Sequence, residues 1–115
     1  MLLNGGVWEG QRYLQPSTIQ LFTSYQSATS RRGLGFDKTA KDNANSKDPY
    51  PSLSAPQSVF GHTGFTGTCV WADPDNQLLY IFLSNRVFPT RDNKAFSNLN
   101  LRAKIQEQIY KALKK

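Results

Sequence analysis

The chain's only histidine lies within an eight-residue stretch, FGHTGFTG, that covers residues 60–67. The stretch also holds three glycines and two threonines, and residues that favour strands flank it. A buried strand does not ordinarily carry that much glycine, because glycine has no side chain to pack and costs backbone entropy. The composition therefore predicts a segment whose main chain is closely approached and which presents small polar groups.

Three kinds of chemistry are compatible with these residue types. His62 is a candidate general base with Asp37 or Asp73 and a serine, but no G-x-S-x-G elbow marks that serine. Glycines can cradle phosphate, yet neither G-x-x-x-x-G-K-[ST] nor G-x-G-x-x-G at a strand-to-helix junction is present. In the third chemistry, the stretch is the edge strand of an acyl-transfer site, where a backbone N–H stabilises an oxyanion.

The glycines at positions 61, 64 and 67 suit the acyl-transfer site, because they let an acyl substrate lie against the strand. They equally suit a structural role, in which they form a bulge and His62 is a partly exposed strand residue. Spacing alone leaves these two interpretations open.

The surrounding sequence predicts an α+β fold. Helical spacing indicates a helix over 16–27, and a short strand is expected over 33–36. Two strong strand signals, over 59–72 and 78–85, flank turn-forming residues and predict the main antiparallel hairpin. The second of them is apolar on both faces, as expected of a strand covered on both sides.

The clearest helix signal covers residues 98–114, with Asn98 as its N-cap. Its apolar residues fall on one stripe that we expect to pack on the hairpin; they are Leu101, Ile105, Ile109, Ala112 and Leu113.

Length and composition fit one small unit over residues 1–115, interrupted by a polar surface loop at 38–57. The single Cys69 excludes an internal disulfide, no residues have zinc-site spacing, and no cofactor or metal is indicated. No apolar run is long enough for a membrane span, and the first residues do not resemble a signal peptide.

The net charge of +6 arises entirely in residues 86–115, which carry eight basic and two acidic side chains. A basic helix can bind nucleic acid or an anionic membrane surface, but no nucleic-acid motif accompanies it. A solvated polar face with a lysine tail explains the charge as well, and no nucleic-acid partner is expected.

The segment FGHTGFTGTCVWADPDNQLLYIFLSNRVFP resembles the C-terminal part of the serine β-lactamase-related superfamily. That superfamily includes class C β-lactamases, D-alanyl-D-alanine carboxypeptidases and related penicillin-binding-protein-like esterases. Its third motif is Lys-Thr-Gly or His-Thr-Gly, and positions 62–64 read His-Thr-Gly here. Asp-Pro at 73–74, Asn-Arg at 85–86 and Phe-Pro at 88–89 follow in the order of that superfamily. The resemblance extends over almost the whole chain, least well over the polar loop, and implies a partial β-lactamase/transpeptidase-like fold.

By this resemblance, His62, Thr63 and Gly64 line a substrate cleft, with His62 and Thr63 directed at a carboxylate or carbonyl group. The backbone N–H of Phe65 is then one of two oxyanion donors. Asn85 and Arg86 match an Asn-basic pair and are expected near the carboxylate end of the substrate.

The chain lacks the two motifs that supply catalysis in this superfamily. No serine is followed three residues later by lysine, as in Ser-x-x-Lys, and no Tyr-x-Asn occurs. We therefore expect no catalytic residue in this chain, which would be the C-terminal, substrate-side portion of a larger serine hydrolase and inactive alone. The parent would cleave β-lactam, D-alanyl peptide or ester bonds through an acyl-enzyme.

Partners and location follow from the same resemblance. The missing N-terminal part is the expected partner, and surface left exposed without it predicts a homo-oligomer or domain swap. Superfamily members usually act outside the cytoplasmic membrane, which predicts a periplasmic or extracytoplasmic location. The alternative is a non-catalytic interaction module that retains the fold and contacts an acidic partner through its basic C-terminal helix.

Overall fold

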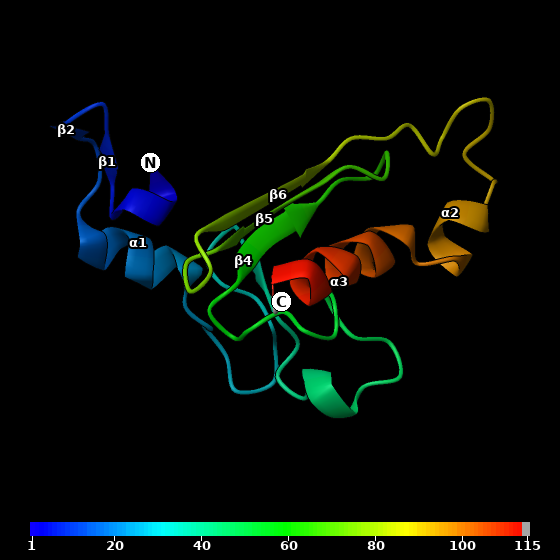
Figure 1. Ribbon diagram of the computed structural model, residues 1–115, viewed down its shortest axis with the longest axis horizontal. Coiled ribbons are helices and arrows are strands. Elements are labelled where there is room, and N and C mark those ends of the chain that lie inside the picture. The colour runs from blue at the N-terminus through cyan, green and yellow to red at the C-terminus, as the bar shows by residue number, and fades with distance from the viewer. Residues whose placement is uncertain (114–115) are drawn as a thin grey trace.

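The computed structural model describes residues 1–113 and confirms the α+β class (Figure 1). A four-stranded antiparallel sheet has the order β3-β4-β5-β6, and a separate two-stranded sheet pairs β1 with β2. In chain order the elements are η1 (Leu2–Asn4), β1 (Val7–Trp8), β2 (Gln11–Arg12), α1 (Pro16–Thr23), β3 (Asp37–Lys38), η2 (Asn43–Asn45), β4 (Phe60–Thr63), β5 (Cys69–Asp73), β6 (Leu78–Phe82), α2 (Ala95–Asn98) and α3 (Leu101–Leu113).

The expected hairpin exists between β5 and β6, where Asp73 pairs with Leu78 across the turn. Residues 59–72, however, form two strands rather than one. The chain reverses after Thr63, and β4 pairs back on β5 with Thr63 opposite Cys69. Gly67 makes this reversal possible, since its φ of 96° lies in a region that side chains rarely adopt. The octapeptide is therefore a strand followed by a tight turn.

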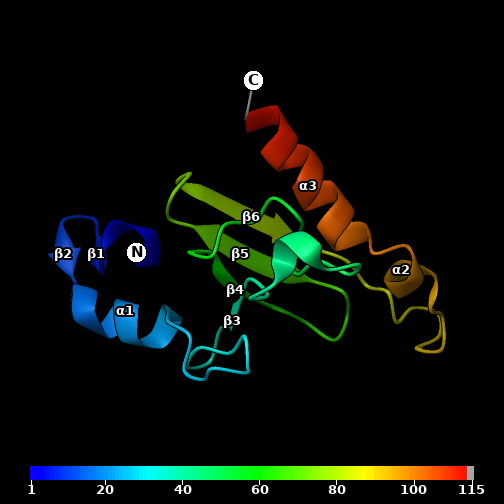
Figure 2. The same ribbon diagram turned by 90° about the horizontal axis from the view of Figure 1, so that it is seen from below.

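The core lies on one face of this sheet, under α3 (Figures 1 and 2). Trp71 and Tyr80 project from adjacent strands into it, and Tyr110 of α3 packs against them. Residue Tyr110 also donates a hydrogen bond to the buried carboxylate of Asp73, at 2.8 Å. The polar anchor thus fixes how α3 sits on the sheet.

The helix predicted at the C-terminal end is present, but its bounds and its buried face differ from the expectation. Residue Asn98 ends α2 and does not cap α3, and residue 114 lies outside the described residues. The buried side chains of α3 are Ala103, Gln106 and Tyr110, whereas Ile105 and Leu113 of the predicted stripe are 41% and 52% exposed. The prediction counted apolar residues only. It therefore missed that the buried face of α3 includes a tyrosine and a glutamine.

The polar segment 38–57 is not a simple surface loop. Thr39, Asn43 and Ser52 are buried within it. The Asn43 side chain closes the loop, because its Nδ2 donates to the Ser52 carbonyl and its Oδ1 accepts from the Tyr50 amide, both at 2.7 Å. Backbone amides and carbonyls satisfied in this way let a polar segment fold against the sheet. The strand expected over 33–36 is also absent, and its place in the sheet is taken by the next two residues, β3.

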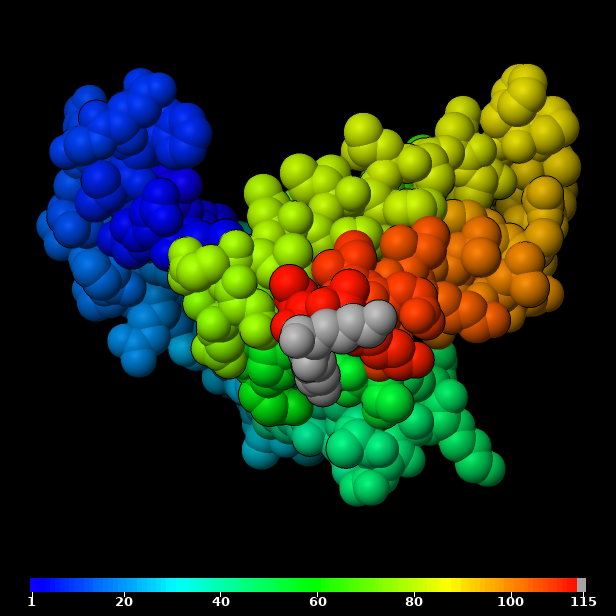
Figure 3. Space-filling view, viewed as in Figure 1, coloured from blue at the N-terminus to red at the C-terminus, as the bar shows by residue number. Residues whose placement is uncertain are grey.

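The opposite face of the sheet is largely uncovered by the described residues, although Phe60 and Ala72 on it are buried. Leu79 and Ile81 of β6 are 53% and 56% exposed, and Val70 of β5 is 44% exposed. The expectation that β6 is covered on both sides is therefore not met within residues 1–113. The N-terminal elements stand beside the sheet as a separate lobe (Figures 2 and 3), with a cavity of about 470 Å³ between η1 and this face.

The helix predicted over 16–27 ends earlier, at Thr23, and none of the residues of α1 is buried. Within residues 1–113, no helix has both the length and the apolar character required to span a membrane.

Candidate functional site

The outer edge of β4 is open beyond its first two residues. β3 pairs only with Phe60 and Gly61, and β5 occupies the other edge along the whole strand. The Gly64 amide donates to the Thr68 carbonyl, at 2.7 Å on the β5 side. Because main-chain groups alternate in direction along a strand, those of Thr63 point to the open edge. The amide of Phe65, in the turn that follows, has no hydrogen-bond partner among the described residues.

The two side chains of the motif project to opposite faces of the sheet. His62 is opposite Val70, on the uncovered face, whereas Thr63 is opposite Cys69, on the face that carries the core. The structure therefore places His62 and Thr63 at one strand end but gives them different surroundings.

His62 is exposed and both of its ring nitrogens are engaged. Its Nδ1 lies 2.8 Å from the Thr63 carbonyl oxygen, and its Nε2 lies 3.0 Å from Nη1 of Arg32. The same Nη1 lies 2.7 Å from the buried carboxylate of Asp37. Arg32, which the sequence analysis did not single out, thus joins the motif to β3.

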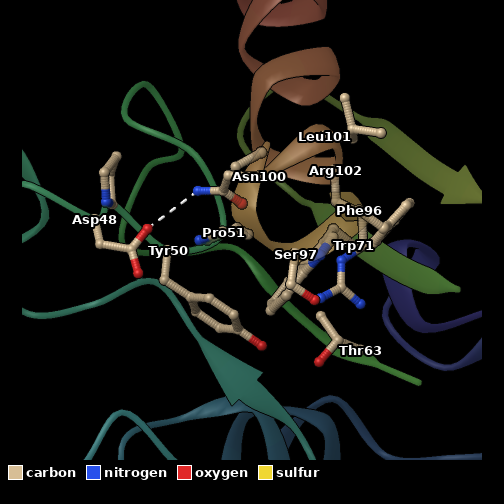
Figure 4. A pocket seen from close by; sticks show the side chains of 12 residues that line it. Asp48, Tyr50, Pro51, Thr63, Trp71, Phe96, Ser97, Asn100, Leu101 and Arg102 are labelled. Atoms are coloured by element: carbon tan, nitrogen blue, oxygen red, sulfur yellow. Dashed lines mark hydrogen bonds between the residues drawn. The ribbon is translucent and has the colours of Figure 1, made fainter. Parts of the chain in front are cut away.

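Thr63 lines a cavity of about 250 Å³ on the other side (Figure 4). Its wall is formed by the loop before residue 52, the end of β4 and the start of α3. Tyr50 and Arg102 line it together with Thr63, and Ser97 adds a hydroxyl. A hydrogen bond of 3.1 Å from Asn100 to Asp48 closes one side. The hydroxyls of Thr63 and Ser97 and the guanidinium of Arg102, in one small cavity, suit a polar or anionic group of a ligand.

Two residues of this cavity are held in place by the structure around them. The hydroxyl of Tyr50 donates to Asp37 at 2.6 Å, and burial followed by that hydrogen bond raises the pKa of this phenol. Tyr50 therefore remains a neutral donor. Arg102 donates to the Thr68 carbonyl at 3.3 Å, and its guanidinium lies 5.5 Å from the Phe96 ring centre.

Arg86 lies against the turn that follows the motif. Its guanidinium is 4.8 Å from the centre of the Phe65 ring, and its amide donates to the Thr66 carbonyl at 2.9 Å. Asn85 is exposed, and its side chain makes no hydrogen bond among the described residues. The structure thus brings Arg86, and not the Asn85 side chain, into contact with the turn that carries the Phe65 amide, the expected oxyanion donor.

Two of the three glycines of the stretch, Gly61 and Gly67, have a structural explanation. A Cβ on Gly61 would lie 2.1 Å from the Val70 carbonyl oxygen and 2.8 Å from the Trp71 Cα. Gly61 is therefore needed for close approach of β5, and Gly67 for the turn. Their presence does not by itself require a substrate along the strand.

Sequence reasoning missed Arg32, Tyr50 and Arg102. Each is separated from His62 by many residues, and no spacing rule links them to it. Their only sequence signal is residue type, since arginine and tyrosine are common in polar binding sites.

Comparison with known proteins gives one family match. The family described as Beta-lactamase matches residues 2–104. A protein of Escherichia coli (strain K12), named "Putative D-alanyl-D-alanine carboxypeptidase", is 30% identical in an alignment 122 residues long. The alignment covers 98% of this chain and 27% of the relative. A protein of the same name from Salmonella enteritidis PT4 (strain P125109) is 33% identical over 86 residues, covering 75% of this chain and 19% of the relative. The chain thus spans about a quarter or less of the length of these curated relatives.

Proposed function

The chain belongs to the Beta-lactamase family, and from this premise we propose that it is the substrate-side part of a serine hydrolase. The parent enzyme would form an acyl-enzyme with a β-lactam, a D-alanyl peptide or an ester. The observation that carries the proposal is the open end of β4, where Thr63 lines the cavity and the unpartnered Phe65 amide follows two residues later along the chain.

Each group at this strand end has a role in the proposed reaction. The Phe65 amide donates to the carbonyl oxygen of the scissile bond as negative charge develops on it. One donor of this kind lowers the barrier by roughly 3–4 kcal/mol in hydrolases. The Thr63 hydroxyl and Arg102 would hold a carboxylate or carbonyl of the substrate in the cavity. Arg86 supports the turn that presents the amide.

The remainder of the proposed enzyme supplies the groups that this chain lacks. With no Ser-x-x-Lys and no Tyr-x-Asn, residues 1–115 contain neither the nucleophile nor its base. The uncovered sheet face, with Val70, Leu79 and Ile81 exposed, offers an apolar surface on which that remainder can pack. D-alanyl peptides belong to the bacterial cell wall, so the proposed enzyme acts in the periplasm or outside the cytoplasmic membrane.

The proposal is tested on the full-length protein that contains this chain, with a chromogenic ester and a chromogenic β-lactam as substrates. Replacing the serine of a Ser-x-x-Lys motif by alanine should abolish hydrolysis of whichever substrate is cleaved. Thr63→Val, which removes the hydroxyl but keeps the shape, should lower kcat/KM by about tenfold or more. Thr66→Val is the matched control in the adjacent turn and should change kcat/KM little.

Two results would contradict the proposal. Hydrolysis that survives the serine substitution excludes the acyl-enzyme mechanism, and equal effects of Thr63→Val and Thr66→Val exclude the assigned role of Thr63. A full-length protein that hydrolyses nothing but binds an acidic peptide would favour the alternative interaction module. Lys104 and Lys111, both exposed on α3, would carry that contact.

A further inference from the structure

We propose that Arg32 is a positioning residue that holds His62 in the neutral tautomer with its proton on Nδ1. In this arrangement the imidazole ring is fixed against the Thr63 carbonyl at the open edge of β4. The inference concerns the chain itself and does not depend on the proposed hydrolase function.

The assignment follows from the donors and acceptors around the ring. A guanidinium carries only donors, so Nε2 of His62, 3.0 Å from Arg32 Nη1, has to accept. An imidazolium has no acceptor, and a proton on Nε2 would place two donors face to face. The remaining proton is therefore on Nδ1, which donates to the Thr63 carbonyl oxygen at 2.8 Å. Both contacts are satisfied by this one tautomer.

Asp37 holds the guanidinium of Arg32 where it can donate to Nε2 of His62. It is 2% exposed, and its Oδ1 lies 2.7 Å from Arg32 Nη1. That oxygen accepts no well-aligned hydrogen bond among the described residues, so the contact acts as an ion pair. On the other carboxylate oxygen, Tyr50 donates at 2.6 Å and Arg31 lies at 3.8 Å. A buried carboxylate needs this compensation, and Arg32 supplies the shortest cationic contact.

The arrangement changes what the motif can offer to a ligand. His62 has no free N–H, so it cannot donate to a substrate as the sequence predicted. The positive charge beside the motif instead belongs to Arg32, whose Nε and Nη2 have no partner among the described residues. The ring also covers the Thr63 carbonyl, which leaves the amides of Thr63 and Phe65 as the main-chain donors free for a ligand at this strand end. Capping one carbonyl in this way also limits pairing of the open edge with another strand.

The test is nuclear magnetic resonance of the 115-residue chain labelled with ¹⁵N at histidine. Because His62 is the only histidine, each ring nitrogen gives a single resonance. Long-range ¹H–¹⁵N correlations, recorded at a pH where the imidazole is neutral, show which nitrogen carries the proton. We expect a protonated Nδ1 in the folded chain and, in denaturant, the Nε2–H form that histidine prefers in water.

Two variants separate positioning from a general structural effect. Arg32→Ala should shift Nδ1 to the unprotonated range and Nε2 to the protonated range. Arg31→Ala is the matched control, because Arg31 contacts Asp37 and the Tyr50 ring but makes no contact with His62. It should leave the tautomer unchanged.

A folded wild-type chain with the proton on Nε2 would overturn the inference, as would an equal tautomer change in both variants. Unchanged backbone amide resonances of β5, recorded on uniformly ¹⁵N-labelled samples, show whether each variant is folded. If Arg32→Ala does not fold, the comparison of folded and denatured wild-type chain still decides the tautomer.

Discussion

Removing one hydroxyl from α3 tests how this helix is held on the sheet. The hydroxyl of Tyr110 donates to the Asp73 carboxylate at 2.8 Å, and both side chains are buried. Burial, and next the hydrogen bond to Asp73, raise the pKa of Tyr110, so the hydroxyl remains a donor at neutral pH. Tyr110→Phe keeps the ring and deletes only this bond. Because α3 also carries Arg102 into the cavity beside Thr63, the bond supports the candidate site as well as the core.

The expected cost follows from what Asp73 retains. A hydrogen bond to a charged group stabilises a protein by about 1.5–3 kcal/mol. After the substitution, Asp73 still accepts from the amides of Asp75 and Asn76 and from the Asn76 side chain, at 2.9–3.1 Å. The Asp73 carboxylate therefore keeps three hydrogen bonds, so we expect a loss of stability in the lower half of the 1.5–3 kcal/mol range. We expect Tyr110→Phe to lower the free energy of unfolding by about 1.5–2 kcal/mol.

Tyr80→Phe is the matched control, since it is the same chemical change on the facing strand. The Tyr80 hydroxyl donates to a neutral group, the Arg102 carbonyl, at a longer distance of 3.2 Å. A neutral hydrogen bond contributes about 0.5–1.5 kcal/mol, and the longer distance here favours the lower part of that range. Urea unfolding of the 115-residue chain measures both, and with a slope of about 1.5 kcal/mol/M the Tyr110 variant should unfold about 1 M earlier than wild type.

An equal or smaller loss for Tyr110→Phe than for Tyr80→Phe would refute this reasoning. It would mean that the Asp73 contact contributes no more than a neutral hydrogen bond. A changed slope in either variant would show that more than a single bond was altered.

Three further predictions concern the sheet and its surroundings. Burial lowers the pKa of Lys38 to about 8, so the folded chain releases this proton before the unfolded chain does. Lys38 should therefore add stability as the pH rises from about 8 to about 10, so the free energy of unfolding of wild type relative to Lys38→Met, measured by urea unfolding, should increase over this range. Gly61→Ala should lower the free energy of unfolding by about 2 kcal/mol or more, because its Cβ would meet the β5 backbone. Gly64→Ala, which meets only a flexible threonine hydroxyl, should cost less, and equal losses would contradict the packing argument. Sedimentation of the 115-residue chain at tens of micromolar should show a dimer or a larger oligomer. Ile81→Lys, on the exposed sheet face, should weaken this association, whereas the control Leu113→Lys on α3 should not. A monomeric wild-type chain would exclude self-association.

The candidate site was predictable only where its residues lie close together in the sequence. The His-Thr-Gly motif was recognised because residues 62–64 are contiguous, whereas the turn that follows was not predicted, since one strand was expected over 59–72. Arg86 was found because it follows a strand end in the order typical of the family. Arg32, Tyr50 and Arg102 could not be found, since folding of three distant segments brings them to β4.

The sequence by itself determined the class of fold, the family resemblance, the β5–β6 hairpin and the existence of a C-terminal helix. Turn residues and apolar periodicity act over a few neighbouring positions, so these features are encoded locally. Tertiary structure alone decided which face of α3 is buried, which residues surround His62, and that Thr39, Asn43 and Ser52 are buried. Those outcomes depend on polar contacts between distant segments, such as Tyr110 with Asp73. Most buried polar side chains have a hydrogen-bond partner that only folding brings to them, and local sequence does not record that partner.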